Sequence, residues 1–158
     1  MEEKIYDVAI IGSGPAALTA AIYTSRGGAS TLIIGGETWG GQLMLTTQVD
    51  NFPGFPDGIQ GPDLLKAMRK QAERFGAKFI EKSVEKVDFS QMPFRVMVND
   101  QWLMAKTVII ATGADDIKLN VPGEKELMGK GVAVCAVCDA AFYKDKIALV
   151  VGGGDAAC

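Results

Sequence analysis

Two cysteines three positions apart, Cys135 and Cys138, are the residues with the clearest chemical potential. A zinc site needs about four ligands, and the sequence offers only one further cysteine and no histidine. A purely structural disulfide is also disfavoured, because so short a loop would stabilise the fold by only about 2 kcal/mol. The spacing is typical of a redox-active pair, in which one sulfur attacks as a thiolate.

Asp139 follows this pair directly. Its carboxylate would lie within reach of the Cys138 sulfur and could move a proton there, but an ordinary surface aspartate fits the sequence equally well. For the third cysteine, Cys158, we expect a buried helix position rather than a reactive one.

A glycine turn forms the second chemical feature. Gly12-x-Gly14-x-x-Ala17 lies between a predicted strand (residues 5–11) and a predicted helix (residues 16–26). The first glycine permits a tight turn, the second lets backbone approach a pyrophosphate, and the helix start supplies amide donors. In this context the pattern predicts a dinucleotide site.

The same spacing recurs 140 residues later. Gly152-x-Gly154-x-x-Ala157 follows an apolar stretch, residues 146–151, which we expect to be a strand. Two such turns imply two dinucleotides, with electrons passing from one to the other. A plain glycine turn remains the alternative for the second one.

The remaining elements predict an α/β, Rossmann-like fold. We expect buried strands at residues 5–11, 31–34 and 107–111, a strand at 78–80, an extended stretch at 84–89, and a hairpin of 94–98 and 102–105 turning at Asn99-Asp100. Residues 62–75 predict an amphipathic helix whose Lys66, Arg69, Lys70 and Glu73 face solvent. Residues 35–61 form a long glycine-rich connection, a length that indicates function.

Composition removes several classes of function. The 158 residues are 48% hydrophobic and carry a net charge of −3, which argues against nucleic-acid binding and polybasic membrane attachment. The absence of histidine excludes Ser-His-Asp triads and haem-histidine ligation. With no signal peptide and no apolar segment near 20 residues, we expect a soluble cytoplasmic protein.

Taken together, the motifs closely resemble the N-terminal half of the low-molecular-weight thioredoxin reductases, FAD-containing pyridine nucleotide–disulfide oxidoreductases. The matching segments are Gly12-Ser-Gly-Pro-Ala16, Gly40-Gly-Gln42, Asn51-Phe-Pro-Gly54, Ala111-Thr-Gly113, Cys135-Ala-Val-Cys-Asp139 and Gly152-Gly-Gly-Asp155. They cover nearly the whole chain. The resemblance implies an incomplete three-layer ββα FAD/NAD(P)-binding fold (residues 1–113), then the start of a similar NADPH-binding domain (residues 114–158).

The resemblance also implies roles for individual residues. By this resemblance, the FAD pyrophosphate binds at Gly12, Ser13, Gly14, Pro15 and Ala16, and the adenosine end lies near Glu37 and Val87. The flavin is lined by Gly41, Gln42, Leu43, Thr46 and Asn51. The backbone at Ala111, Thr112 and Gly113 passes close to the cofactor. Gly152 and Gly154 belong to the NADPH turn. Cys138 would face the flavin, Cys135 would attack the partner's disulfide, and Asp139 would donate a proton.

The implied function is electron transfer from NADPH through FAD and Cys135–Cys138 to thioredoxin or a similar small dithiol protein, in a homodimer. Alternatives are a related flavoprotein using NADH or ferredoxin, one serving a peroxiredoxin-type partner, or a non-catalytic FAD-binding fragment. A thioredoxin-like fold is disfavoured, because it needs no such glycine turns. We expect the 158 residues alone not to oxidise NADPH.

Overall fold

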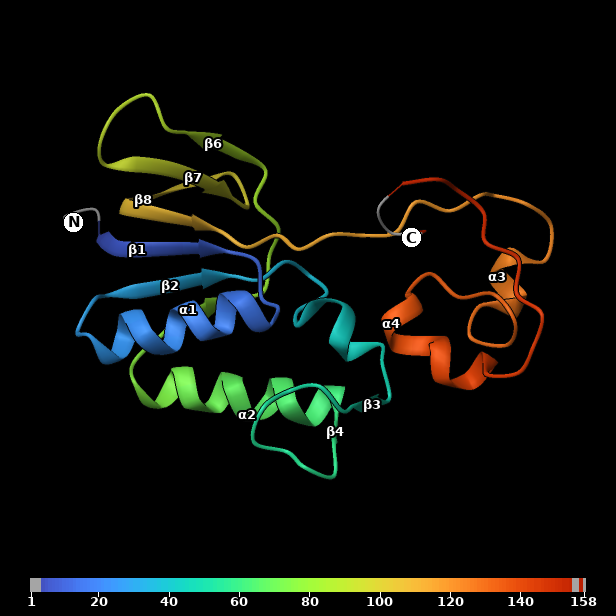
Figure 1. Ribbon diagram of the computed structural model, residues 1–158. Helices are drawn as coiled ribbons and strands as arrows, with labels where there is room; N and C mark the ends of the chain where they lie inside the picture. The colour runs from blue at the N-terminus through green and yellow to red at the C-terminus, as the bar shows by residue number, and fades with distance from the viewer. Residues whose placement is uncertain (1–3, 155–156, 158) are drawn as a thin grey trace. The chain divides into compact units, whose positions relative to one another are not determined.

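The computed structural model of the protein describes residues 4–154 and residue 157. The chain forms two compact units, Met1–Gly113 and Ala114–Cys158 (Figure 1).

The first unit is built on a mixed six-stranded sheet. Its strands are β1 (Ile5–Ile11), β2 (Thr31–Ile34), β5 (Lys78–Ile80), β6 (Lys86–Asp88), β7 (Phe94–Val98) and β8 (Gln101–Ile110), in the order β5-β2-β1-β8-β7-β6. The first four neighbours are parallel, whereas β6, β7 and β8 pair antiparallel. This is the mixed α/β sheet of a Rossmann-like nucleotide-binding fold, as the sequence predicts.

Two helices, α1 (Pro15–Arg26) and α2 (Gly61–Arg74), cover one face of the parallel strands (Figure 1). The antiparallel end of the sheet turns over the opposite face of these strands, so that β7 packs on β2. Successive residues of β2 pack against different layers. Ile33 packs in the cluster that contains Leu18 and Leu64 of the helices, whereas Leu32 packs in the cluster that contains Val96 of β7. A period of two places successive side chains on opposite faces, so the unit has three layers.

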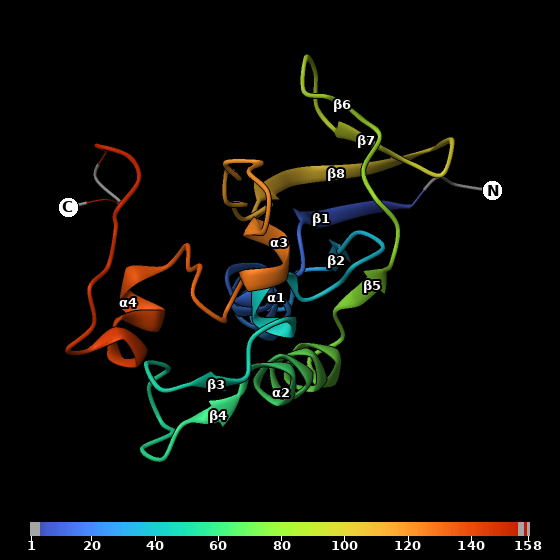
Figure 2. The ribbon, with the colours of Figure 1, turned by 90° about the vertical axis from the view of Figure 1, so that its right-hand side faces the viewer.

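The connection between β2 and α2 is more ordered than the sequence predicts. It contains a 3-10 turn, η1 (Gly41–Met44), and a short antiparallel pair, β3 (Gln48–Val49) and β4 (Ile59–Gln60). Figure 2 shows this pair beside the start of α2. A local turn and a strand pair of two residues each leave no periodic hydrophobic pattern, so the sequence does not predict them.

The predicted hairpin is confirmed. Asn99 and Asp100 both have positive φ, 51° and 59°, as a two-residue turn between right-twisted strands requires. The predicted separate strand at residues 107–111 is wrong in its bounds, because one strand, β8, continues from Gln101 to Ile110. Coverage of β1 on both faces is confirmed near its carboxyl end, where the adjacent residues Ala9 and Ile10 point to opposite faces and are both buried. The other residues of the strand are half-buried, and Ile5 is exposed.

The second unit consists of short elements, α3 (Glu124–Leu127), α4 (Ala136–Asp139) and η2 (Ala140–Tyr143). Glu124 is buried and accepts hydrogen bonds from the backbone N–H groups of Leu119 (2.9 Å) and Asn120 (2.6 Å), which fixes the turn before α3. The predicted strand at residues 146–151 is wrong. None of the described segments pairs with it, and Ile147 and Leu149 are exposed. No helix in the described residues is long and apolar enough to cross a membrane.

The side chain of Asp7, in β1, bonds to both neighbouring strands of the sheet: to β8 through Lys106 and to the residue before β2 through Ser30. Its carboxylate accepts hydrogen bonds from Lys106 Nζ (2.8 Å), Ser30 Oγ (2.7 Å) and Ser30 N (2.9 Å). The bond from Lys106, followed by those from Ser30, holds the pKa of Asp7 well below its ordinary value of 3.8. A depressed carboxyl pKa stabilises the fold above the unfolded-state pKa, and the contribution is lost as the pH falls through the folded-state pKa.

We therefore expect Asp7→Asn to lower the free energy of unfolding at neutral pH and to reduce its decline under acid. The measurement is urea unfolding of both proteins at neutral pH and at a pH below about 3. Asp50→Asn serves as control, since its side chain is bonded to Gln48 and to no cation. Equal acid sensitivity of Asp7→Asn and the unmodified protein would contradict this account.

Candidate functional site

The ends of three parallel strands meet at Gly12. Its N–H donates to the Ile34 carbonyl (2.9 Å), and the Ala111 N–H donates to the Ile11 carbonyl (2.8 Å). Gly12 has a φ of 119°, and a Cβ there would overlap the carbonyl oxygen of Ala111 and lie 2.6 Å from its carbonyl carbon. Only glycine fits this position, so the turn presents bare backbone at the carboxyl edge of the sheet.

The start of α1 follows this turn. Pro15 occupies its first turn, Gly14 makes no capping side-chain hydrogen bond, and no acidic residue lies in the first turn. The first N–H groups of a helix have no partner within it. Together with the positive end of the helix dipole, these donors suit an anionic group such as a pyrophosphate.

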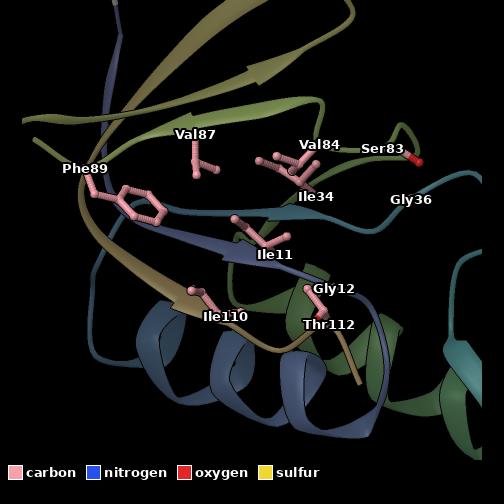
Figure 3. A pocket seen from close by; sticks show the side chains of 10 residues that line it. All are labelled: Ile11, Gly12, Ile34, Gly36, Ser83, Val84, Val87, Phe89, Ile110 and Thr112. Atoms are coloured by element: carbon pink, nitrogen blue, oxygen red, sulfur yellow. The ribbon is translucent and has the colours of Figure 1, made fainter. Parts of the chain in front are cut away.

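A pocket of about 420 Å³ adjoins the turn (Figure 3). It is lined by Ile11, Gly12, Ile34, Gly36, Ser83, Val84, Val87, Phe89, Ile110 and Thr112. Figure 3 shows the aliphatic side chains of β1, β2 and β6 gathered over the sheet face opposite the helices. An apolar hollow beside unpaired amide donors can accept a flat, apolar ring system that is linked to phosphate. Gly12, Val87 and Thr112, all predicted cofactor contacts, are brought together here.

The glycine loop after β2 lies against the same turn. Ser13 is 5% exposed; its hydroxyl donates to the Gly35 carbonyl (2.8 Å) and accepts from the Gly40 N–H (2.8 Å). A Cβ on Gly41 would lie 3.8 Å from Gly14 Cα. The predicted flavin loop and the predicted pyrophosphate turn are therefore neighbours, and the Ser13 side chain bonds to that loop.

The other predicted loop residues are placed less tightly. Gln42 and Leu43 belong to η1, where Leu43 packs against the core, and Thr46 is half-buried. Asn51 lies in the exposed turn after β3. Glu37 is 74% exposed, pairs with Lys82 (3.6 Å) and does not line the pocket.

Arg69 packs against Trp39 of the glycine-rich loop, a contact that the sequence did not predict. The amphipathic pattern places it on the solvent face of α2, but its side chain is only 23% exposed. The guanidinium lies 4.9 Å from the ring centroid of Trp39 and 4.7 Å from that of Phe79. Burial opposes the charge, but hydrogen bonds with Glu73 and Glu81 outweigh it and raise the pKa of Arg69. No sequence signal relates these positions, because they come from three elements.

The predicted redox pair lies in the second unit. Cys135 is half-buried directly before α4, and the Asp139 N–H donates to its carbonyl (3.0 Å). Cys138 lies within α4, and its side chain is outside the described residues. Asp139 is half-buried. No atom of the described residues lies within 4 Å of a Cβ added to Gly152 or Gly154. Asp155 and Cys158 are outside the described residues.

Comparison with known proteins decides the family. Residues 6–158 match the family described as pyridine nucleotide-disulphide oxidoreductase. The chain belongs to this family. Within it, the match is to the N-terminal portion of the thioredoxin reductases.

Individual members of the family show how far the similarity extends. Thioredoxin reductase of Bacillus subtilis is 50% identical over 156 residues, which are 99% of this chain and 49% of the relative. NADPH-dependent thioredoxin reductase 3 of Arabidopsis thaliana is 47% identical over 98% of this chain and 30% of its own. The crystal structure of thioredoxin reductase from Streptococcus pyogenes superposes with a TM-score of 0.86 at 46% identity, covering 97% of this chain and 50% of that one. The chain thus spans about half the length of most of these thioredoxin reductases, or less.

Proposed function

We propose that the complete protein is a flavoprotein disulfide reductase that passes electrons from NADPH through FAD to the Cys135–Cys138 disulfide and on to thioredoxin. The observation that carries the proposal is the combination, in one member of this family, of a bare-backbone nucleotide turn with a Cys-x-x-Cys pair. Neither feature alone specifies a disulfide reductase, since the turn occurs in many dinucleotide enzymes and the pair in many thiol proteins.

The first unit fits FAD. We assign the pyrophosphate to the turn from Gly12 to Ala16 and the adenine to the apolar pocket at Val87, with Ala111, Thr112 and Gly113 passing nearby. Gly41, Gln42, Leu43, Thr46 and Asn51 would line the flavin, and Glu37 would lie at the adenosine end. When bound, FAD supplies the exchange of an electron pair between a hydride donor and a disulfide.

The cysteines would carry the electron pair onward. Cys135 is disulfide-bonded in the structure, and we assign Cys138 as its partner. Two electrons and two protons convert that disulfide to two thiols. The Cys135 thiolate would then attack the disulfide of thioredoxin and form a mixed disulfide. Cys138 would attack the Cys135 sulfur, which releases reduced thioredoxin and restores the Cys135–Cys138 disulfide, with Asp139 moving the proton.

The second unit would open the NADPH-binding domain, so the proposed boundary lies at residues 113–114. Gly152 and Gly154 would belong to its phosphate turn. The names of two relatives support thioredoxin as partner and NADPH as donor. We further propose a homodimer.

The test is thioredoxin reduction by the complete protein with NADPH, in the unmodified form and as Cys138→Ser. We expect the substitution to abolish turnover, because the mixed disulfide can no longer be resolved. Cys158→Ser is the matched control and should retain turnover. Turnover that survives Cys138→Ser would contradict the proposal, and turnover with NADH or ferredoxin but not NADPH would contradict the donor.

A further inference from the structure

Arg69 is held between two rings by two carboxylates. Its guanidinium stacks on Trp39, from the loop after β2, and on Phe79, from β5. Nε pairs with Glu73 (2.9 Å) and Nη1 pairs with Glu81 (2.6 Å). An arginine that is bonded at two nitrogens and lies over two rings has little rotational freedom left, so it is a rigid support for the rings.

Trp39 connects this support to the nucleotide turn. The next residue, Gly40, donates its N–H to the buried Ser13 hydroxyl (2.8 Å). The backbone at Gly40 has a φ of 93°, and a Cβ there would overlap the Met44 side chain and lie 3.0 Å from Leu65 Cδ1. The loop is thus held by Ser13 from the turn and by Arg69 through the neighbouring ring.

The positive charge of Arg69 strengthens its contact with the two rings. Cation–π attraction grows as the cation loses water, and the Arg69 side chain is 23% exposed. A neutral side chain of similar length would fill the space between the rings without holding them electrostatically. The loop would then lose one of its supports beside Gly14 and keep the Ser13 hydrogen bond and the packing of η1 against the core.

We propose that Arg69 is a positioning residue, which holds the Gly40–Gln42 backbone in register with the Gly12–Pro15 turn and so sets the affinity of the site for FAD. The inference rests on the proposed function for the identity of the cofactor. It assigns Arg69 no contact with FAD; the residue acts through Trp39.

The test compares Arg69→Met with Arg95→Met in the complete protein. Arg95 is a matched control, because it also stacks on a tryptophan, Trp102 (5.4 Å), and pairs with an aspartate, Asp88, but lies on β7. After removal of FAD, titration with FAD should give a dissociation constant about fivefold higher for Arg69→Met. Arg95→Met should match the unmodified protein, and Arg69→Lys should recover part of the loss.

A second readout follows the loop without FAD. The difference in fluorescence between the complete protein and its Trp39→Phe variant isolates the signal of Trp39, and acrylamide quenching of that signal should increase in Arg69→Met. Unchanged FAD affinity or unchanged quenching in Arg69→Met, with normal FAD binding by the unmodified protein, would overturn this inference alone. Failure of the unmodified protein to bind FAD would overturn the proposed function as well.

Discussion

Gly12→Ala is expected to weaken FAD binding about a hundredfold and to lower the free energy of unfolding by about 3 kcal/mol. A methyl group at Gly12 would overlap the Ala111 carbonyl oxygen, and the φ of 119° is one that alanine rarely adopts. Both obstacles are backbone, so relief requires β1 and β8 to separate at the end where they present their amides. The turn that we assign to the pyrophosphate would then be displaced.

Gly28→Ala is the control that separates the effect of backbone strain on stability from the effect on the FAD site. Gly28 also has a positive φ, 88°, but no atom lies within 4 Å of an added Cβ. We expect a loss of about 1 kcal/mol in stability from backbone strain and unchanged FAD affinity. Urea unfolding and FAD titration measure both quantities. If Gly12→Ala behaved like Gly28→Ala, the close approach of β1 and β8 at this turn would not matter for the cofactor.

Gly61→Ala is expected to have the next largest effect. A Cβ on Gly61, at the start of α2, would overlap the Leu43 carbonyl oxygen and lie 2.7 Å from the Thr46 methyl group. Alanine favours a helix over glycine by about 1 kcal/mol, so a gain would be expected without this contact. We expect instead a loss of about 2 kcal/mol, and FAD binding weakened about thirtyfold, because Leu43 and Thr46 both belong to the proposed flavin loop.

Gly27→Ala is the matched control. Gly27 likewise lies at a helix terminus, as the C-cap of α1, and has an ordinary φ of −74°. The nearest atom to an added Cβ is 3.3 Å away. It lies at the far end of α1 from the nucleotide turn, so FAD affinity should not change. Stabilisation by Gly61→Ala, with normal FAD binding, would show that η1 does not need its close contact with α2.

Local sequence patterns predicted the parts of the fold that depend on local physics. The turn at Gly12 needs a conformation that glycine provides, and the Asn99-Asp100 hairpin needs two residues that tolerate positive φ. Both therefore leave a mark within a few residues. The Cys-x-x-Cys pair leaves a mark of the same kind, since the chemistry predicted for it depends on spacing along the chain.

Features that depend on distant partners were not predictable in this way. The apolar residues 146–151 have the composition of a strand, but a strand forms only with a neighbour, and none of the described segments supplies one. Arg69 has the spacing of a solvated residue on α2. Its burial comes from Trp39 and Phe79, which approach it from other elements.

The central claim is that flavin and disulfide act in series, and an anaerobic titration of the complete, FAD-loaded protein with NADPH tests it most directly. The disulfide and the flavin each accept one electron pair, so the oxidised protein should consume two equivalents of NADPH per chain before excess NADPH accumulates. The double variant Cys135→Ser/Cys138→Ser should consume one. Equal consumption by the two proteins would contradict the account, because the cysteine pair would then take no electrons from the flavin.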